Sequence, residues 1–467
     1  MTAITPCPAF DRGSFRDRSG RVFSFEGRVF RAISQSASAD WDSISAKTFF
    51  VTAMQSGRVV QTERSPSMDS FAKSEGFAAA LEHERLPLIS WPYEWSFSML
   101  REAALLQLDL MNDCLADGFI LKDASAFNVQ FRGSRPQFID VGSMVPYVSG
   151  QTWDGYRQFC QMMLFPLMLQ AWKGVHFQPA LRGSLEGIAP DQFAALLGVW
   201  DFFRRGALTH VWLHARLQAK SPSQVRISQS MQRSGFGKSM ILNNVKGLRK
   251  AVAGLQWKPS ASTWSDYDQS SEPVLRDGAV KESFIENVCR NKRYSVVWDL
   301  GCNQGRYSRI AAQTADVVLA TDSDHLTIDR LYQSLRSEDN RNIVPLVVDL
   351  ADPSPALGWR GAERPGLEQR SKPNLIFCLA LIHHLVIGKN LLLREVIEWL
   401  ASFNADVVIE FVERDDAQVR ELLRNREDVF SDYCRQSFLQ SVNQHFEIQN
   451  QRVLPSGTRT LFLLKPK

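Results

Sequence analysis

The chain of 467 residues lacks the sequence features of disulfide-rich, zinc-binding, membrane-spanning and secreted proteins. Its seven cysteines are dispersed and form no Cys-x-x-Cys pair, which argues against a disulfide framework and a zinc site, so no metal is expected. No apolar run is long enough to span a bilayer, and the N-terminal residues have no apolar core of signal-peptide length. We therefore expect a cytoplasmic protein without a membrane span, in a reducing compartment.

The chain also lacks a large net charge, since the formal value is only +4. Residues 216–258 nevertheless carry nine Lys or Arg and no Asp or Glu. This segment is either a basic surface for an anionic partner such as nucleic acid or a solvated helical connector, and the small net charge favours the connector. The expected division is an N-terminal domain at 1–215, a basic connector with a polar linker at 216–277, and a C-terminal domain at 278–467.

What the chain does have is a series of apolar runs in its C-terminal half that end in polar residues. The first run, 296–300, predicts a buried strand, followed by a turn that contains Gly301, Asn303 and Gly305 and then by a helix. Four more buried strands are expected at 317–321, 343–348, 375–379 and 406–411, and two late runs at 446–453 and 460–464 predict an antiparallel hairpin. The pattern indicates an α/β, Rossmann-like domain that binds a ligand at the carboxyl ends of its strands.

The acidic residues at those strand ends indicate the kind of ligand. A dinucleotide enzyme would place a glycine where Asn303 stands, and Asp299 would repel a diphosphate but could pair with the amino group of a cationic amino-acid moiety. That combination favours S-adenosylmethionine over NAD. Asp322, about 20 residues further on, could take the ribose hydroxyls, although Asp324 could serve instead and either could cap the next helix.

These strand ends, together with Leu379–Leu385 and Ile409–Val412, resemble class I S-adenosylmethionine-dependent methyltransferases, whose sheet has seven strands and a terminal antiparallel hairpin. More narrowly, four short stretches are similar to a bacterial subgroup, the NoeA-like host-specific nodulation proteins: Gly358-Trp359, Glu363-Arg364, Leu379–Leu385 and Ile409–Val412. The resemblance implies that the turn around Asp299 holds the methionine part, Asp322 the ribose and Asp349 the adenine, with Leu379 beside the cofactor. The methyl acceptor stays unidentified, with an oligosaccharide or a small metabolite linked to nodulation as the candidates, and the oligomeric state stays unknown.

Two further groups of residues are candidates for catalysis and acceptor binding. His383 or His384, just after the fourth strand, could act as a general base, or one could pack in the core while the other caps a helix. The long connection between the third and fourth strands carries Trp359, Arg364 and Arg370. With Glu410 these side chains could hold an acceptor, or the connection could be a solvated flap. Both alternatives stay open.

In the N-terminal half, residues 118–142 resemble the protein kinases. Asp123 is followed five residues later by Asn128, and a strand then ends at Asp140 in an Asp-x-Gly turn, so that Asp123 would orient a hydroxyl while Asn128 and Asp140 would ligate magnesium. No Gly-rich loop precedes a strand lysine in residues 1–60, which favours a degenerate, kinase-like α+β domain for binding or scaffolding over a working kinase. A coincidental turn between core strands is the alternative.

The sequence therefore predicts an S-adenosylmethionine-dependent methyltransferase. A cofactor-binding regulatory or scaffolding protein with a pseudokinase-like domain is the first alternative. An RNA methyltransferase is the second, and it would require the basic segment 216–258 to be exposed and to bind RNA in a salt-dependent way.

Overall fold

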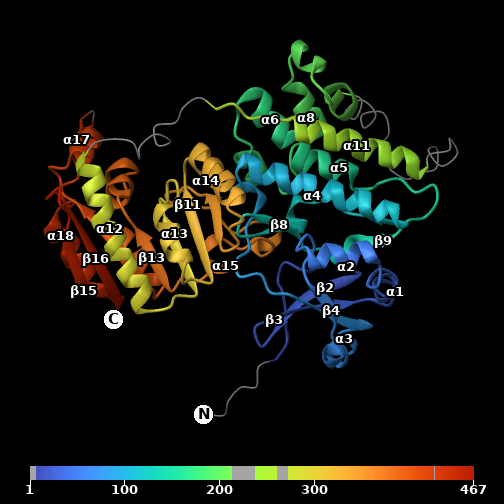
Figure 1. The fold of residues 1–467 in the computed structure, drawn as a ribbon, viewed down its shortest axis with the longest axis horizontal. Helices are drawn as coiled ribbons and strands as arrows, with labels where there is room; N and C mark the ends of the chain where they lie inside the picture. Colours follow the sequence, from blue (N-terminus) through green and yellow to red (C-terminus); the bar gives the residue numbers. More distant parts are fainter. Residues whose placement is uncertain (1–6, 213–236, 260–271, 425) are drawn as a thin grey trace.

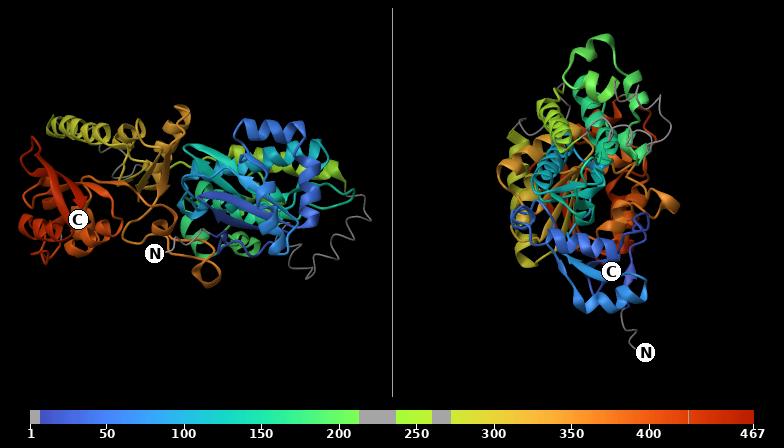
Figure 2. Two further views of the ribbon diagram at one scale, coloured as in Figure 1. Left: turned by 90° about the horizontal axis from the view of Figure 1, so that it is seen from below. Right: turned by 90° about the vertical axis from the view of Figure 1, so that its right-hand side faces the viewer.

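The chain forms two halves that lie side by side along the long axis of the molecule (Figures 1 and 2). This computed structural model describes residues 7–212, 237–259, 272–424 and 426–467. Residues 216–236 of the expected basic segment and 260–271 of the expected linker lie outside the described residues. None of the helices in these ranges combines the length and the apolar character that a membrane span requires.

The N-terminal half begins with a five-stranded antiparallel sheet in the order β1-β2-β3-β5-β4. The hairpin between β2 and β3 turns on Glu26 and Gly27, whose φ angles of 49° and 76° suit a two-residue hairpin turn. Phe23 and Phe30 stack across this hairpin and anchor a small apolar core. The strands are β1 (Ala9–Phe10), β2 (Gly20–Phe25), β3 (Arg28–Ile33), β4 (Thr62–Arg64) and β5 (Ala79–His83), with helices α1 (Gln35–Ile44), α2 (Thr48–Gln55) and α3 (Asp69–Ser74).

A mainly helical layer follows, built around α4 (Phe97–Ala116), whose N-terminus is capped by the Ser96 side chain. The apolar run Phe159–Trp172 is helical and almost wholly buried in this layer. The layer also contains the strand pairs β6 (Phe119–Leu121) with β9 (Met144–Pro146) and β7 (Val129–Arg132) with β8 (Arg135–Phe138), and the helices α5 (Gly155–Phe159), α6 (Phe165–Lys173), α7 (Gln178–Gly183), α8 (Pro190–Ala195) and α11 (Lys238–Gly254).

Helix α11 lies in the described part of the expected basic connector. Its apolar residues Ile241, Val245, Leu248 and Val252 are buried, and the helix packs along α4. The described part of the basic segment is therefore a layer of the N-terminal half, because one face of the helix is apolar enough to join its core.

The C-terminal half is a twisted sheet in the order β12-β11-β10-β13-β14-β16-β15, in which the first five strands are parallel and β16 runs antiparallel to both its neighbours. This mainly parallel sheet confirms the α/β class predicted for the C-terminal half. The strands are β10 (Val296–Leu300), β11 (Val317–Asp322), β12 (Ile343–Val347), β13 (Leu375–Cys378), β14 (Asp406–Val412), β15 (Phe446–Val453) and β16 (Arg459–Pro466).

Helices cover both faces of this sheet (Figure 1). The α-helices described in this half are α12 (Glu272–Asn291), α13 (Arg306–Ala312), α14 (His325–Ser337), α15 (Leu367–Arg370), α16 (Leu393–Ser402), α17 (Ala417–Leu423) and α18 (Arg435–His445). The chain runs outward from β10 to β12 on one side and from β13 to β14 on the other. Such a reversal of strand order leaves a crevice at the carboxyl ends of the two central strands, where open α/β sheets bind ligands.

The two halves share one apolar core and are not separated by a solvated interface. A single cluster of buried side chains includes Trp95 and Phe131 from the N-terminal half and Trp298 and Tyr332 from the C-terminal half. Phe131 and Tyr332 meet edge to face, with ring centroids 5.9 Å apart. Hydrogen bonds also join the two halves. Asp329 of α14 accepts hydrogen bonds from the Ser98 backbone amide and hydroxyl at 2.7 and 3.0 Å.

Candidate functional site

A cavity of about 330 Å³ opens at the carboxyl ends of β10, β11 and β13. We call it the C-terminal cavity. Its size suits a nucleoside-sized ligand, since small-molecule sites start at about 300 Å³. The residues predicted to bind the cofactor or to act as base that line it are Asp299, Gly301, Asn303, Asp322, Asp349, Leu379 and His384.

Asp299 stands at the end of β10 and is 1 % exposed. Its carboxylate accepts a hydrogen bond from the Ser308 hydroxyl, but no lysine or arginine in the described residues forms an ion pair with it. Burial, with a smaller contribution from Asp322, raises the pKa of Asp299 to about 6. A buried carboxylate without a counter-ion is costly, so this position favours a ligand that brings a positive charge.

The turn after Asp299 needs left-handed backbone at three points. Gly301 and Gly305 have φ angles of 70° and 73°, and Asn303 has 47°. A Cβ atom on Gly301 would lie 3.2 Å from Leu381, and one on Gly305 would lie 2.7 Å from Leu331, so both glycines also provide space. Gly305 itself begins α13 and does not line the cavity. The Asn303 side-chain oxygen is buried without a hydrogen-bond partner, an unmet acceptor beside the cavity.

The neighbouring acids Asp322 and Asp324 have separate tasks. Asp324 caps α14, because its carboxylate accepts hydrogen bonds from Leu326 and Thr327 at 2.9 and 3.0 Å. Asp322 lines the cavity and accepts hydrogen bonds from the backbone amides of Asn303 and Asp324 at 3.1 and 2.9 Å. Burial raises the pKa of Asp322. Of the two acids, Asp322 is the one available to a ribose.

Asp349 lies at the rim, where its carboxylate is already in use. One oxygen is 2.7 Å from the Lys389 ammonium, and the other accepts a hydrogen bond from Ala351. A ligand base at this end of the cavity would therefore meet the flanking backbone more readily than the carboxylate.

The two histidines differ sharply in position. His384 lines the cavity, whereas His383 is fully buried outside it, with its Nε2 3.2 Å from the Gln418 side-chain oxygen. Burial, with a smaller contribution from Arg459, lowers the pKa of His384 to about 4, so its ring is neutral at pH 7 and keeps one nitrogen lone pair. His384 also begins a π-helical turn, a local irregularity that often occurs at functional sites.

A buried charge network that the sequence did not reveal closes one end of the cavity. Glu410, expected to contact an acceptor, is fully buried and accepts a hydrogen bond from the Ala380 amide. The Lys281 ammonium of α12 lies 2.8 Å from Glu410, and Arg459 of β16 lies 3.5 Å from Glu410 and 2.8 Å from Asp416. Lys281 and Arg459 line the cavity in its place. Glu410 thus holds the cavity wall, including Ala380 in its left-handed conformation (φ 47°).

Leu350, at the start of the long connection after β12, lines the C-terminal cavity, but Trp359, Arg364 and Arg370 do not, which corrects the expectation that these three side chains hold the acceptor. Arg370 forms a fully buried ion pair with Glu94 of the N-terminal half, and Arg364 lies over the Phe127 ring at 4.2 Å. Trp359 is 65 % exposed, and the cavity lining includes neither this tryptophan nor the two arginines. The role of the two arginines was wrongly predicted, because cations in a long loop can bind another part of the protein as readily as a ligand.

The kinase-like residues form a separate cluster in the N-terminal half. The Asn128 amide nitrogen donates to an Asp140 oxygen at 3.4 Å, and the Arg31 guanidinium of β3 lies 3.1 Å from the other oxygen. Burial, and then the charge of Asp140, raises the pKa of the nearby Asp123. Arg31, which no motif singled out, therefore already supplies the positive charge that Asp140 would otherwise take from a metal ion. Among the described residues, no group of three or more His, Cys, Asp or Glu side chains is placed to hold a metal.

The whole chain is similar to one curated protein, the nodulation protein NoeA of Rhizobium meliloti (strain 1021). The two are 34 % identical over 467 residues, which cover 99 % of this chain and 97 % of that protein. The similarity therefore includes both halves. No protein-family model matches the chain.

Among solved structures, two methyltransferases are similar to part of the chain. The N-methyltransferase NodS from Bradyrhizobium japonicum WM9, in complex with S-adenosylhomocysteine, has a TM-score of 0.32 and 12 % identity and covers 44 % of this chain and 97 % of its own. The magnesium protoporphyrin IX methyltransferase ChlM from Synechocystis PCC 6803, with bound S-adenosylmethionine, has a TM-score of 0.30 and 15 % identity and covers 45 % of this chain and 87 % of its own.

Proposed function

Because this chain belongs to the family of the nodulation protein NoeA, we propose that it is an S-adenosylmethionine-dependent methyltransferase with an acceptor linked to nodulation. The observation that carries the proposal is Asp299, a buried carboxylate that lines the C-terminal cavity and has no counter-ion in the described residues. A dinucleotide would add negative charge here, whereas the methionine part of S-adenosylmethionine carries an ammonium group that would pair with it.

The other cavity residues fit the same cofactor. Asp322 offers acceptors for the ribose hydroxyls, and the unpartnered Asn303 oxygen is free for a further donor. Leu379 supplies an apolar wall, and the backbone beside Asp349 is open to the adenine edge. When bound, the cofactor supplies an activated methyl group, so that the remaining task of the protein is to orient the acceptor and to manage its proton.

His384 is the residue placed for that proton. Its ring is neutral at physiological pH because burial lowers its pKa to about 4, and it lines the cavity beside Ala380 and Leu381. A hydroxyl or ammonium acceptor must lose a proton, and a neutral imidazole can receive it. We propose His384 as the base and not His383, because His383 is fully buried and contacts the Gln418 side chain.

The acceptor that we favour is an oligosaccharide or a small metabolite, in keeping with the nodulation name of the relative. In the rival proposal the protein binds the cofactor for regulation or scaffolding without turnover. An RNA acceptor would need an exposed basic surface, yet in the described part of segment 216–258 one face of α11 is packed against α4.

Two measurements test the proposal in sequence. Calorimetric titration of the full chain with S-adenosylhomocysteine should give saturable one-to-one binding, and NADH should give none. Labelled S-adenosylmethionine with an extract of the source bacterium should then yield a methylated product that mass spectrometry can identify. Cofactor binding without any product would support the regulatory rival, and the absence of binding would end both proposals.

A further inference from the structure

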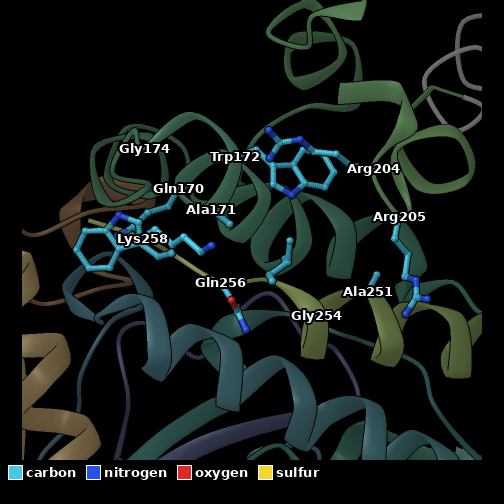
Figure 3. Close-up of a pocket in the computed structure, with 12 residues that line it drawn as sticks. Gln170, Ala171, Trp172, Gly174, Arg204, Arg205, Ala251, Gly254, Gln256 and Lys258 are labelled. Atoms are coloured by element: carbon cyan, nitrogen blue, oxygen red, sulfur yellow. The ribbon is translucent and has the colours of Figure 1, made fainter. Parts of the chain in front are cut away.

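A second cavity lies in the N-terminal half, away from the strand ends of the C-terminal sheet. It has a volume of about 670 Å³ and is bounded by the end of α6, by Arg204 and Arg205, and by the end of α11 with the residues that follow it (Figure 3). We call it the α6–α11 cavity. Its size falls within the range of small-molecule sites.

The lining of this cavity is unusual in its chemistry. Among the described residues, the lining contains two indole rings, Trp172 and Trp257, and three cations, Arg204, Arg205 and Lys258, but no aspartate or glutamate. Arg204 is partly committed, because it lies over the Trp172 ring at 5.5 Å and 3.3 Å from Asp201. Arg205 and Lys258 have no hydrogen bond or ion pair with any described residue.

One structural explanation for these cations, the capping of helix ends, can be compared with the geometry. The carboxyl ends of α6 and α11 border the cavity, and cations often neutralise the carbonyl groups at such ends. Neither Arg205 nor Lys258 donates to one of those carbonyls; the carbonyl of Leu255 accepts from Arg101 instead. Capping therefore does not account for the two cations.

A third feature of the lining is the side chain of Gln170. It is fully buried, and both its amide oxygen and its amide nitrogen lack a hydrogen-bond partner in the described residues. Unsatisfied buried amides are rare and costly in folded proteins. A ligand with a polar ring edge would supply the missing donor and acceptor.

We propose that the α6–α11 cavity binds a nucleoside phosphate. The base stacks on an indole ring, as aromatic rings bind bases generally, and the phosphate pairs with Arg205 and Lys258. A single bounded cavity, with three cations among its described lining residues, favours a small molecule over a nucleic-acid strand, which needs a continuous basic groove. The site is independent of the C-terminal cavity and adds a second ligand to the protein.

Calorimetric titration of the full chain with ADP tests the proposal. EDTA is present to remove metal ions, and saturating S-adenosylhomocysteine occupies the C-terminal cavity. Arg205→Glu should weaken ADP binding at least tenfold, whereas Lys246→Glu, an equal charge reversal on an exposed α11 residue outside the lining, should change it less than twofold.

Further ligands separate the parts of the proposal. Inorganic pyrophosphate, which has the diphosphate without the ring, should bind at least tenfold more weakly than ADP, and equal binding would overturn the role of the indoles. Affinity for oligoadenylate RNA that rises with its length would overturn the small-ligand assignment. No ADP binding at millimolar concentration, or binding that Asp140→Asn abolishes and Arg205→Glu does not, would overturn the site itself.

Discussion

Each half of the molecule contains an Asp-x-Gly sequence at or just after the end of a strand, and the two aspartates have opposite surroundings. Asp140 in the N-terminal half lies 3.1 Å from Arg31 and accepts a hydrogen bond from Asn128. Asp299 in the C-terminal half is buried with only the Ser308 hydroxyl as its side-chain partner in the described residues. One carboxylate is neutralised within the protein, and the other requires a charge from outside.

The difference teaches that a motif acquires its function from its counter-ion. Both turns have the sequence pattern of a ligand site. Removing the paired acid would leave a cation of the protein without its partner. The unpaired acid, in contrast, lowers the stability of the protein until a ligand binds. The comparison predicts different responses to the same substitution in the two halves.

The largest effect is expected for Asp299→Asn. The substitution removes the partner of the cofactor ammonium, and breaking a buried ion pair costs about 3 to 5 kcal/mol, so the dissociation constant for S-adenosylhomocysteine should rise more than about a hundredfold. Asp140→Asn should leave that constant within about twofold, since Asp140 lies in the other half. Calorimetry on both variants checks this, and equal losses would remove the contrast.

A second contrast concerns the paired histidines. His384→Ala should lower kcat about a hundredfold, within the usual range for the loss of a general base, without changing cofactor affinity. Added imidazole should restore part of the rate, an effect that a purely structural role would not produce. Full kcat in this variant would show that the acceptor needs no base at this position.

The third prediction concerns the pH dependence of stability in the absence of cofactor. The pKa of Asp299 is raised from 3.8 to about 6, so the unfolded chain loses this proton first, and stability falls as pH rises from about 4 to 6. The decline attributable to this group is about 3 kcal/mol. Denaturant unfolding of the free protein and of Asp299→Asn should therefore diverge across that window in favour of the variant. Parallel curves would show that Asp299 has a partner in solution.

The smallest expected effect is the loss of stability in Asp140→Asn. The substitution leaves the Arg31 side chain, only 14 % exposed, without its carboxylate, which should cost about 1 to 3 kcal/mol in the free energy of unfolding. Urea unfolding measures this, with the exposed Glu398→Ala as the control. A stabilised variant, or magnesium-dependent nucleotide binding lost with it, would mean that Asp140 is a ligand after all.

Strands and turns could be predicted from the sequence because their signals are local. The apolar runs of the C-terminal half and the position of Asp299 at a strand end follow from short stretches of residues. Long-range ion pairs could not be predicted, because a single sequence does not say which distant cation meets which acid. Arg31 with Asp140, Lys281 with Glu410 and Arg370 with Glu94 were all missed for this reason.

The ion pair between Glu94 and Arg370 joins residues 276 positions apart in the chain. On a ribosome that adds about 5 to 20 residues per second, Glu94 would be synthesised roughly 14 to 55 seconds before Arg370. During that interval the nascent N-terminal half exposes an apolar docking face that contains an acid without a counter-ion. Co-translational folding of this protein should therefore depend on chaperones that shield this face, and ribosome profiling of chaperone-bound chains should show them engaged until Arg370 has left the exit tunnel.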